Sequence, residues 1–229
     1  PGERIVPYEE DEKTNPKIRV YNDLVRAAYN YSEEPISRKG ITDSELEQVF
    51  IYIKGDYPEL FWLNSYMYTS ETVRHNFRCK NANGVLDVKQ INKKRAELRK
   101  GAKTFTRGIT KKTDPYKALL TIYRRLILTL DYDGIGLDAG LDRDTKQDDK
   151  LRSLHSALVE HKVVCARYAA ALQYMLPSVG TVCGYTISRV SNDGGSCHAF
   201  NILKIGKYCY YIDATWGDSS NTKSGDRMK

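Results

Sequence analysis

Apolar residues recur at helical spacing in the first part of the chain, which predicts two amphipathic helices. The first covers residues 17–31, where one face carries Val20, Leu24, Ala28 and Tyr31. The second follows Thr42-x-x-Glu45, a spacing typical of a capping box, and Gly55 is expected to end it. The core face of this second helix consists of Leu46, Val49, Phe50 and Ile53.

A small β element is predicted between these helices and the middle of the chain. Residues 57–63 form an aromatic connector, whose side chains are expected to pack in a core rather than to bind a ligand. Alternating apolar and polar residues then predict three strands, at 65–69, 72–79 and 85–89, with a turn at 81–84. Residues 1–16 are charged, contain three prolines and show no period, so we expect a mobile leader there.

Helical spacing returns in the middle of the chain. Residues 91–112 keep one apolar face but carry nine Lys or Arg against one acid, Glu97. Asp114 and Pro115 predict the start of the next helix, which has a broad apolar stripe and ends near Asp131. Residues 131–149 are expected to form a solvated acidic loop, since they match a calcium-binding loop poorly. A further helix is predicted over residues 149–160.

The last part of the chain predicts a helix followed by an antiparallel sheet. Residues 165–176 are almost free of charge, so this helix is expected to be buried. Strands are predicted at 181–190, 197–205 and 208–215, and the tight Gly206-Lys207 pair joins the last two. A two-residue loop places Ile205 opposite Tyr208, which in turn places His198 opposite Thr215.

Cys165, His198 and Asp213 form the candidate catalytic group. Cys165 lies in the first turn of the predicted helix, where unpaired N–H groups and the helix dipole favour a thiolate. By the predicted register Asp213 is a diagonal neighbour of His198, about 7 to 8 Å away at the backbone and within hydrogen-bonding reach of its side chain. A lone cysteine or strand histidine is commonly a core residue, but the three together satisfy the test for a nucleophile, a base and an orienting carboxylate.

Three sequence motifs resemble the transglutaminase-like superfamily. Val164-Cys165-Ala166-Arg167-Tyr168-Ala169 is similar to its nucleophile motif, His198-Ala199-Phe200-Asn201 to its His-Ala-Trp-Asn strand, and Ile212-Asp213-Ala214-Thr215-Trp216 to its Val-Asp-x-Thr-Trp strand. The motifs occur in the family's order, and the resemblance covers roughly residues 114–218. Val163 and Arg167 replace glycines of the family pattern, and Phe200 replaces tryptophan. The two glycine replacements could narrow the substrate approach or change its charge, so they affect the expected substrate more than the expected triad.

The resemblance implies an α+β fold with a papain-like transglutaminase core, in which a nucleophile helix packs on an antiparallel sheet. This core would occupy residues 113–229, after a mainly helical region with a small β element over residues 17–112. Relatives usually add further strand after Asp218, which leaves open whether the core is complete. Residues 57–62 resemble uncharacterised proteins of Gram-positive bacteria, which implies an extracytoplasmic setting, secreted or surface-anchored. Since the chain begins at Pro1 rather than Met, a preceding signal or anchor is left open.

The resemblance also implies thiol-dependent acyl transfer on an amide bond of a protein or peptide. Cys165 would attack the carbonyl, His198 would move the proton and Asp213 would hold the imidazole. A cysteine peptidase or amidase is the simplest form of this activity. The sequence does not separate it from a protein-crosslinking transglutaminase, because the triad is shared and only the acceptor differs. A surface module that keeps the fold without turnover is the third alternative. The backbone N–H of Cys165 is expected to be one oxyanion donor, and Ser156 and Tyr185 are candidates for the second.

Charge and composition add little to this assignment. The 229 residues carry a net charge of +7, and the basic helix over residues 91–112 offers a possible contact with an anionic surface. A solvated lysine face is the preferred interpretation, and nucleic-acid binding is disfavoured because no aromatic residues alternate with the charges. No apolar run approaches the roughly 20 residues of a membrane span. Without a C-x-x-C or a paired-histidine spacing, neither a metal nor a cofactor is predicted, and the five cysteines leave at least one thiol free.

Overall fold

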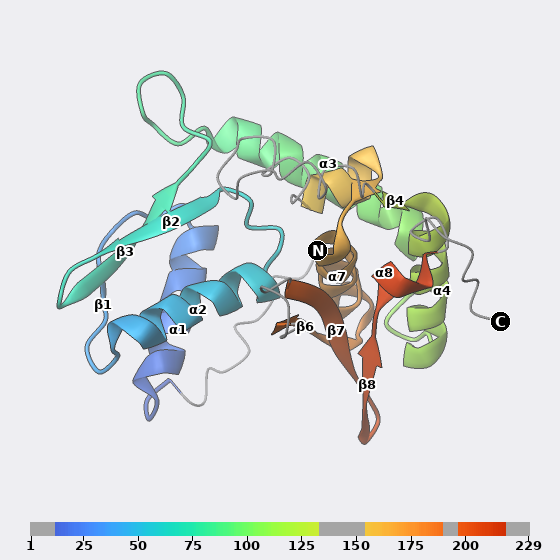
Figure 1. The fold of residues 1–229 in the computed structure, drawn as a ribbon. Helices are drawn as coiled ribbons and strands as arrows, with labels where there is room; N and C mark the ends of the chain where they lie inside the picture. Colours follow the sequence, from blue (N-terminus) through green and yellow to red (C-terminus); the bar gives the residue numbers. More distant parts are fainter. Residues whose placement is uncertain (1–11, 133–153, 190–196, 219–229) are drawn as a thin grey trace. The chain divides into compact units, whose positions relative to one another are not determined.

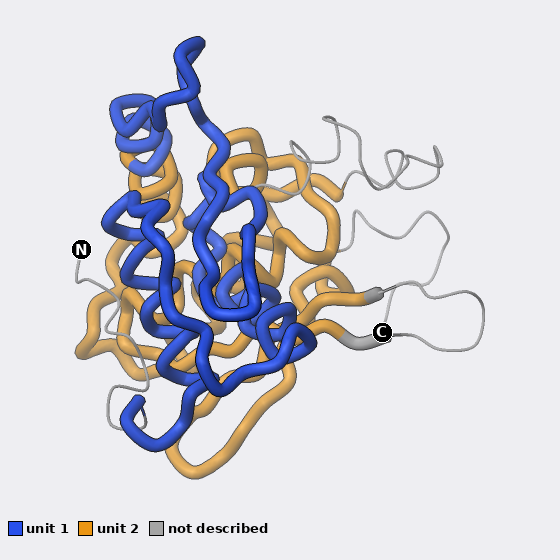
Figure 2. The backbone as a smooth tube through the Cα atoms, turned by 90° about the vertical axis from the view of Figure 1, so that its left-hand side faces the viewer, with its two compact units in different colours: residues 1–95 blue, residues 96–229 orange. Residues whose placement is uncertain are grey.

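A computed structural model describes residues 12–132, 154–189 and 197–218. Two compact units divide the chain, residues 1–95 and residues 96–229 (Figure 2). The division falls inside helix α3 (Val88–Thr106), ahead of the boundary predicted after residue 112. Most of the predicted leader and of the predicted acidic loop lies outside the described residues.

The two predicted N-terminal helices are confirmed. Helix α1 spans Pro16–Tyr29, and the Asn15 side chain accepts hydrogen bonds from the first turn (Figure 1). Helix α2 spans Asp43–Asp56 and carries the complete capping box, in which Thr42 and Glu45 each accept a bond from the other's backbone N–H. The four residues predicted for the core face of α2 are all buried.

An antiparallel sheet of three strands accompanies these helices, in the order β1-β3-β2. Strand β2 (Leu63–Tyr68) and strand β3 (Thr72–Phe77) agree with the predicted pair, while the two-residue strand β1 (Ile36–Ser37) was not predicted. The strand predicted at 85–89 is wrong. Leu86 forms only an isolated bridge to Lys80, because Asp87 accepts a hydrogen bond from the backbone N–H of Gln90 and begins α3.

Trp62 lies at the centre of the first unit's core. Its side chain is fully buried, and the indole N–H donates to the carbonyl oxygen of Ala28 at 3.0 Å. The rings of Tyr29, Tyr31 and Phe61 surround it. The aromatic connector therefore packs in the core, as the sequence predicted, and contributes apolar burial together with one satisfied polar group.

The second unit contains the helices α4 and α7 and the π-helix η2. Helix α4 spans Pro115–Thr129 with Asp114 as its N-cap, as predicted. Helix α7 spans Cys165–Met175, and the 3₁₀ turn η3 (Pro177–Val179) follows it. The predicted helix over residues 149–160 is described only from residue 154, and Ser156–Glu160 form the π-helix η2 instead of a regular α-helix.

Helix α3 continues into the second unit, where it packs closely on η2. Its buried apolar residues are Ile91, Leu98 and Phe105. At Gly101, an added Cβ would lie 2.2 Å from the carbonyl oxygen of Leu158, so only glycine permits this approach. The guanidinium of Arg125 donates to the carbonyl oxygens of Phe105 and Arg107, which ties the end of α3 to α4. The outer lysines of α3 are exposed, and no helix among the described residues is long and apolar enough to cross a membrane.

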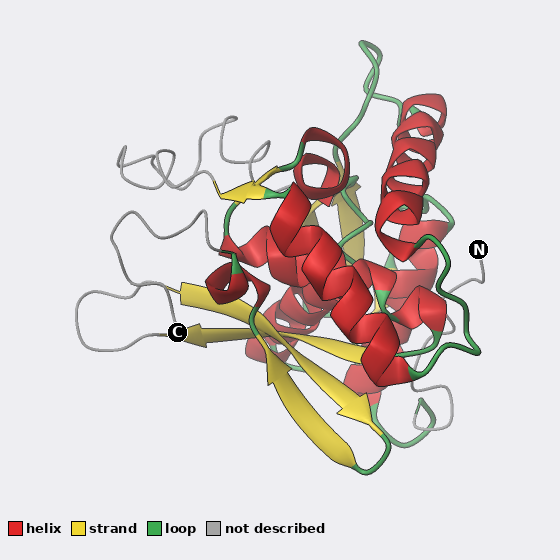
Figure 3. Ribbon diagram, turned by 90° about the vertical axis from the view of Figure 1, so that its right-hand side faces the viewer, coloured by secondary structure: helices red, strands yellow, loops and turns green. Residues whose placement is uncertain are grey.

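The main sheet of the second unit contains β6 (Val182–Arg189), β7 (Cys197–Ile205) and β8 (Tyr208–Ile212), in that order. All pairings in this sheet are antiparallel, and the predicted β7–β8 register is confirmed from Ile205 opposite Tyr208 to Asn201 opposite Ile212. Helix α7 packs against β6 and β7 (Figure 3). A parallel pair, β4 (Asp131–Tyr132) and β5 (Lys162–Val163), was not predicted. Helices and largely antiparallel sheets together confirm the α+β class.

Strand β8 is shorter than predicted. It ends at Ile212, and Asp213 becomes the N-cap of the short helix α8 (Ala214–Gly217). The carboxylate of Asp213 accepts the first free N–H groups of that helix, which stops the strand. His198 therefore has no partner opposite it on β8, contrary to the register extended from the turn.

Candidate active site

Cys165 is the first residue of α7. Val164 precedes it in an extended conformation and provides no side-chain cap, and the backbone N–H of Arg167 in the first turn donates to the carbonyl oxygen of Val164 at 2.9 Å. The side chain of Cys165 is half-buried and a free thiol. This position combines access with the positive end of the helix dipole, as a nucleophilic cysteine requires.

A buried hydrogen bond fixes α7 on the sheet behind Cys165. The side-chain amide of Asn201 on β7 donates to the carbonyl oxygen of Ala169 at 3.0 Å. Asn201 is almost fully buried, and three consecutive alanines at residues 169–171 let the helix approach the strands closely. The contact fixes the position of α7, which carries Cys165, relative to β7. A rigid support of this kind limits the movement of a nucleophile.

His198 and Asp213 are in direct contact. His198 Nε2 lies 2.5 Å from Asp213 Oδ2. The second oxygen of the same carboxylate, Oδ1, accepts hydrogen bonds from the backbone N–H groups of Thr215 at 3.0 Å and Trp216 at 3.2 Å. One carboxylate thus caps α8 and binds the imidazole at the same time. The cap fixes the rotamer of Asp213, so the histidine partner is preorganised by the fold.

The contact with Asp213 determines which ring nitrogen of His198 can act as a base. A carboxylate accepts hydrogen bonds and does not donate them, so Nε2 must carry a proton in this contact. In the neutral imidazole the other nitrogen, Nδ1, then has a free lone pair. Nδ1 is therefore the nitrogen that can accept a proton from a thiol.

The predicted contact between Cys165 and His198 is not a hydrogen bond in the described part of the chain. Catalytic hydrogen bonds are frequently long before substrate binds, so the contact is expected to form with substrate in place. Of the two candidates for a second oxyanion donor, Ser156 is buried and Tyr185 is half-buried on β6, opposite Asn201.

Tyr123 of α4 supports Asp213 from the other side. Its hydroxyl donates to the carbonyl oxygen of Asp213 at 3.4 Å. Gly217 makes room for this ring, since an added Cβ would lie 1.7 Å from the Tyr123 hydroxyl oxygen. Burial, with a smaller contribution from the charge of Asp213, raises the pKa of Tyr123, so the hydroxyl stays protonated as a donor. Neither Tyr123 nor Gly217 was selected from the sequence, because their role depends on how α4 meets α8.

The buried carboxylate of Asp218 connects α7 to the end of α8. The hydroxyl of Tyr168 donates to Asp218 Oδ2, and both side chains are buried. Burial first, and then the hydrogen bond to Asp218, raises the pKa of Tyr168 far above its ordinary value. The pair links the helix that carries Cys165 to the helix that Asp213 caps. The sequence signals Tyr168 through its place in the nucleophile motif but gives no indication of its partner.

Substitution of Tyr168 by phenylalanine is expected to lower the free energy of unfolding by about 1–3 kcal/mol. The change removes one hydroxyl and leaves the buried carboxylate of Asp218 without this donor. Urea unfolding followed by circular dichroism measures the effect. The control is Tyr116→Phe, whose ring is 54% exposed, and for which a change within about 0.5 kcal/mol is expected. Equal effects of the two substitutions would contradict a structural role for the buried pair.

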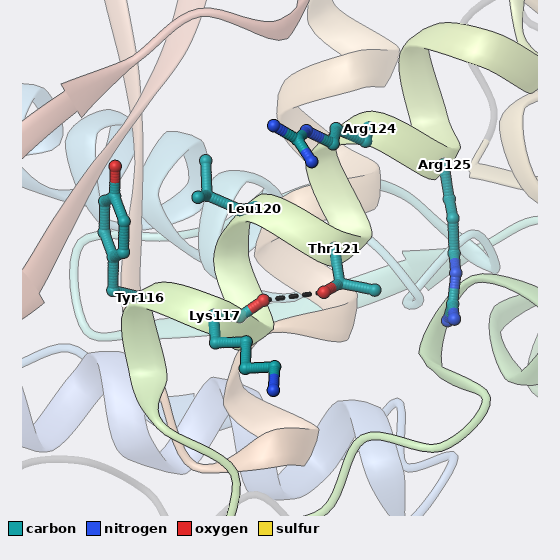
Figure 4. A pocket seen from close by; sticks show the side chains of 6 residues that line it. All are labelled: Tyr116, Lys117, Leu120, Thr121, Arg124 and Arg125. Atoms are coloured by element: carbon teal, nitrogen blue, oxygen red, sulfur yellow. Dashed lines mark hydrogen bonds between the residues drawn. The ribbon is translucent and has the colours of Figure 1, made fainter.

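A hollow of about 530 Å³ lies beside α4, and its lining contains none of Cys165, His198 and Asp213 (Figure 4). The described residues that line it all belong to α4, namely Tyr116, Lys117, Leu120, Thr121, Arg124 and Arg125. They provide cations and apolar surface but no nucleophile with a base. Within the described ranges, no group of three metal-binding side chains comes together either. Among the described residues, Cys165, His198 and Asp213 remain the group with a nucleophile, a base and an orienting carboxylate.

Comparison with solved structures finds three similar chains. No family model matches the chain, and no curated protein matches it. A crystal structure described as that of a TGase is similar with a TM-score of 0.45 and 13% sequence identity. The similarity covers 86% of this chain and 53% of the TGase chain, so the present chain spans about half of that protein's length.

Proposed function

We propose that the protein transfers acyl groups from amide bonds through a thiol, with Cys165 as nucleophile, His198 as base and Asp213 as the orienting carboxylate. The contact between His198 Nε2 and Asp213 Oδ2 carries the proposal. Because Nε2 is bound to Asp213, Nδ1 of His198 is available as a base. His198 lies on β7, which packs against α7, and the half-buried Cys165 is the first residue of α7. The same three residues stand in the motifs that resemble the transglutaminase-like superfamily.

The first half of the reaction forms a thioester. The sulfur of Cys165 attacks the amide carbonyl carbon while His198 Nδ1 takes the thiol proton. Asp213 stabilises the imidazolium that results, and the backbone N–H of Cys165 donates to the developing oxyanion. The tetrahedral intermediate then collapses as the C–N bond breaks. His198 returns the proton to the leaving amine, and the acyl group remains on sulfur.

Water completes the reaction in the form that we propose. A water molecule gives its proton to His198 Nδ1 and attacks the thioester carbon, which releases a carboxylic acid and the free thiol of Cys165. This makes the protein a cysteine peptidase or amidase. A transglutaminase would use a lysine amine in place of water and release an isopeptide, with the same three residues in the same roles.

Product analysis separates the two acceptors. Purified protein is incubated with a glutamine-containing peptide and an excess of a lysine analogue, and the products are identified by mass spectrometry. We expect carboxylic acid as the main product, with Cys165→Ala as the inactive control. A dominant isopeptide product would replace the hydrolase by a transglutaminase, whereas no product from a panel of peptides, with the fold intact, would favour a binding module.

A surface module that has lost turnover is the second candidate. The absence of a Cys165–His198 hydrogen bond among the described residues favours it, as does the Arg167 side chain two residues after the nucleophile. Under this alternative the exposed basic face of α3 would contact an anionic surface outside the cytoplasm. If Cys165→Ala abolished a cellular phenotype while the protein stayed folded, the module would be the wrong assignment.

A further inference from the structure

The segment that leads into Cys165 contains an unusual helical turn. The π-helix η2 (Ser156–Glu160) is closed by the backbone N–H of His161, which donates to the carbonyl oxygen of Ser156. His161 has a left-handed backbone, with a φ of 63°, and the chain enters β5 directly after it. A left-handed residue other than glycine is unfavourable, and π-helical turns are rare outside functional sites. Contacts with other elements must therefore hold this segment in place.

The position of η2 bears directly on Cys165. Residues 161–164 separate the two, and they comprise the left-handed turn, β5 and the N-cap of α7. Val163 and Val164 in this stretch are buried. The π-helix also packs against both α7 and β5. A displacement of η2 is therefore expected to move the first turn of α7 and the thiol with it.

One face of α3 supports this segment within the second unit (Figure 1). At Gly101 the two backbones approach so closely that an added Cβ would lie 2.2 Å from the carbonyl oxygen of Leu158. One helical turn later, the buried ring of Phe105 meets the ring of His161 edge-on, with 6.1 Å between the ring centroids. Residues four apart lie on the same face of a helix, so one stripe of α3 makes both contacts.

The third contact of this stripe is polar. Glu97 lies one turn before Gly101, and its Oε2 is 3.1 Å from Nε2 of His155, the residue directly before η2. The other ring nitrogen of His155, Nδ1, lies 3.3 Å from Oε1 of Glu160, the last residue of η2. Carboxylates only accept, so both contacts are hydrogen bonds when each ring nitrogen carries a proton. His155 thus joins α3 to both ends of η2.

The three contacts are expected to differ in strength. The side chains of His155 and Glu97 are 27% and 40% exposed, and an ion pair with this access to water contributes little by itself. The contact at Gly101 involves a backbone carbonyl, which cannot move away by a side-chain rotation. Gly101 is therefore expected to determine the position of η2, and the pair of His155 and Glu97 to add a smaller contribution.

We propose that Glu97, Gly101 and Phe105, which we call the α3 support, position Cys165 for acyl transfer by fixing η2. They are positioning residues, because they act through η2 on the first turn of α7. The inference rests on the proposed function, since it names what holds the nucleophile of the same site. It predicts that changes on α3 alter the reactivity of a thiol on another helix.

Gly101→Ala tests the α3 support most sharply. Alanine is a better helix former than glycine, so the substitution does not weaken α3 itself. The added methyl group must instead displace the carbonyl of Leu158. Amide hydrogen exchange of the peptide covering residues 156–164 is followed by mass spectrometry. We expect exchange at least about 10-fold faster in Gly101→Ala and within about 2-fold of wild type in Lys100→Ala, an exposed control on the same helix.

Alkylation by iodoacetamide measures the effect on the nucleophile. At pH 6 we expect Gly101→Ala to lower the rate at Cys165 at least about 5-fold relative to the exposed Cys209 of the same molecule. At pH 9 an ordinary thiol is largely ionised without help, so the loss is expected to shrink to within about 2-fold. A substitution that merely loosened the structure would expose the thiol and raise its rate at both pH values.

His155 provides a matched pair of variants. His155→Ala removes the contacts with Glu97 and Glu160 and is expected to lower the pH 6 rate at Cys165 by about 3-fold, the size typical of an exposed ion pair. His155→Arg is expected to restore the rate to within about 2-fold of wild type, because a guanidinium offers several N–H donors to the two carboxylates. Equal rates in wild type and His155→Ala would overturn the role of this contact even if Gly101→Ala failed to fold.

Unchanged exchange in Gly101→Ala would overturn the proposal. So would faster exchange without a lower alkylation rate at pH 6, since η2 would then move without moving Cys165. Turnover of peptides distinguishes this inference from the proposed function. The predicted losses of thiol reactivity, in a wild-type protein that cleaves no peptide, would retain the α3 support and reject the acyl-transfer reaction. Equal kcat in wild type and Gly101→Ala would retain the reaction and reject the support.

Discussion

Substitution of Asp213 by asparagine is expected to lower the rate of acyl transfer by about 10²- to 10⁴-fold while leaving the protein folded. Both oxygens of Asp213 are occupied, one by His198 and the other by the N–H groups that begin α8. Asparagine has a single acceptor oxygen, so it can serve only one of these contacts. If the oxygen keeps the cap, the amide N–H₂ faces His198 Nε2 and imposes the opposite tautomer, in which Nδ1 carries the proton. That tautomer cannot accept a proton from Cys165.

Stability separates the two roles of Asp213. Asparagine and aspartate are N-caps of similar strength, so Asp213→Asn is expected to change the free energy of unfolding by no more than about 0.5 kcal/mol. Asp213→Ala removes the cap as well and is expected to cost about 1 kcal/mol more. Single-turnover kinetics and urea unfolding of both variants give the two quantities, with the exposed Asp131→Asn as control. A rate for Asp213→Asn within a factor of about three of wild type would show that the carboxylate does not orient the base.

Substitution of Trp62 by alanine is expected to produce the largest loss of stability, about 3–5 kcal/mol. The indole is fully buried among Tyr29, Tyr31 and Phe61, so its removal leaves a large cavity. The substitution also removes the donor to the carbonyl oxygen of Ala28. Urea unfolding followed by circular dichroism measures the loss.

Tyr52 provides the control for Trp62. Its ring is on the exposed side of α2 and is 52% accessible, so Tyr52→Ala is expected to cost within about 0.5 kcal/mol. A loss below about 1 kcal/mol for Trp62→Ala would mean that the first unit is held by contacts other than this aromatic core.

The sequence predicted the long elements and failed on the short ones. Residues 16–29 and 43–56 form helices because their caps and apolar spacing are local signals, and the β7–β8 register follows from the Gly206-Lys207 turn. Strand β1 and the parallel pair β4–β5 are two residues long in each strand. These short strands form because tertiary packing brings together backbone groups that are distant in the sequence. The local pattern of apolar and polar residues therefore does not predict them.

The contact between His198 and Asp213 was expected, but for a reason that is wrong. The prediction placed both residues in one ladder, as diagonal neighbours on paired strands. In the structure the ladder ends at Ile212, and Asp213 reaches His198 as the N-cap of α8. Both arrangements bring Asp213 next to His198, because Asp213, the N-cap of α8, directly follows Ile212, the last residue of β8. The support from Tyr123 and Asp218 depends on helix packing and had no signal in the sequence.

The central claim is that His198 activates Cys165 as a thiolate, and alkylation by iodoacetamide tests it most directly. The rate of Cys165 modification is followed by peptide mass spectrometry at pH 6 and pH 9 in wild type and in His198→Ala, with the exposed Cys209 as internal reference. An ordinary thiol is well under 1% ionised at pH 6. We predict that Cys165 reacts at pH 6 at least about 10 times faster than Cys209, and that His198→Ala removes this advantage. Equal rates for the two thiols at pH 6, unchanged by His198→Ala, would contradict the claim.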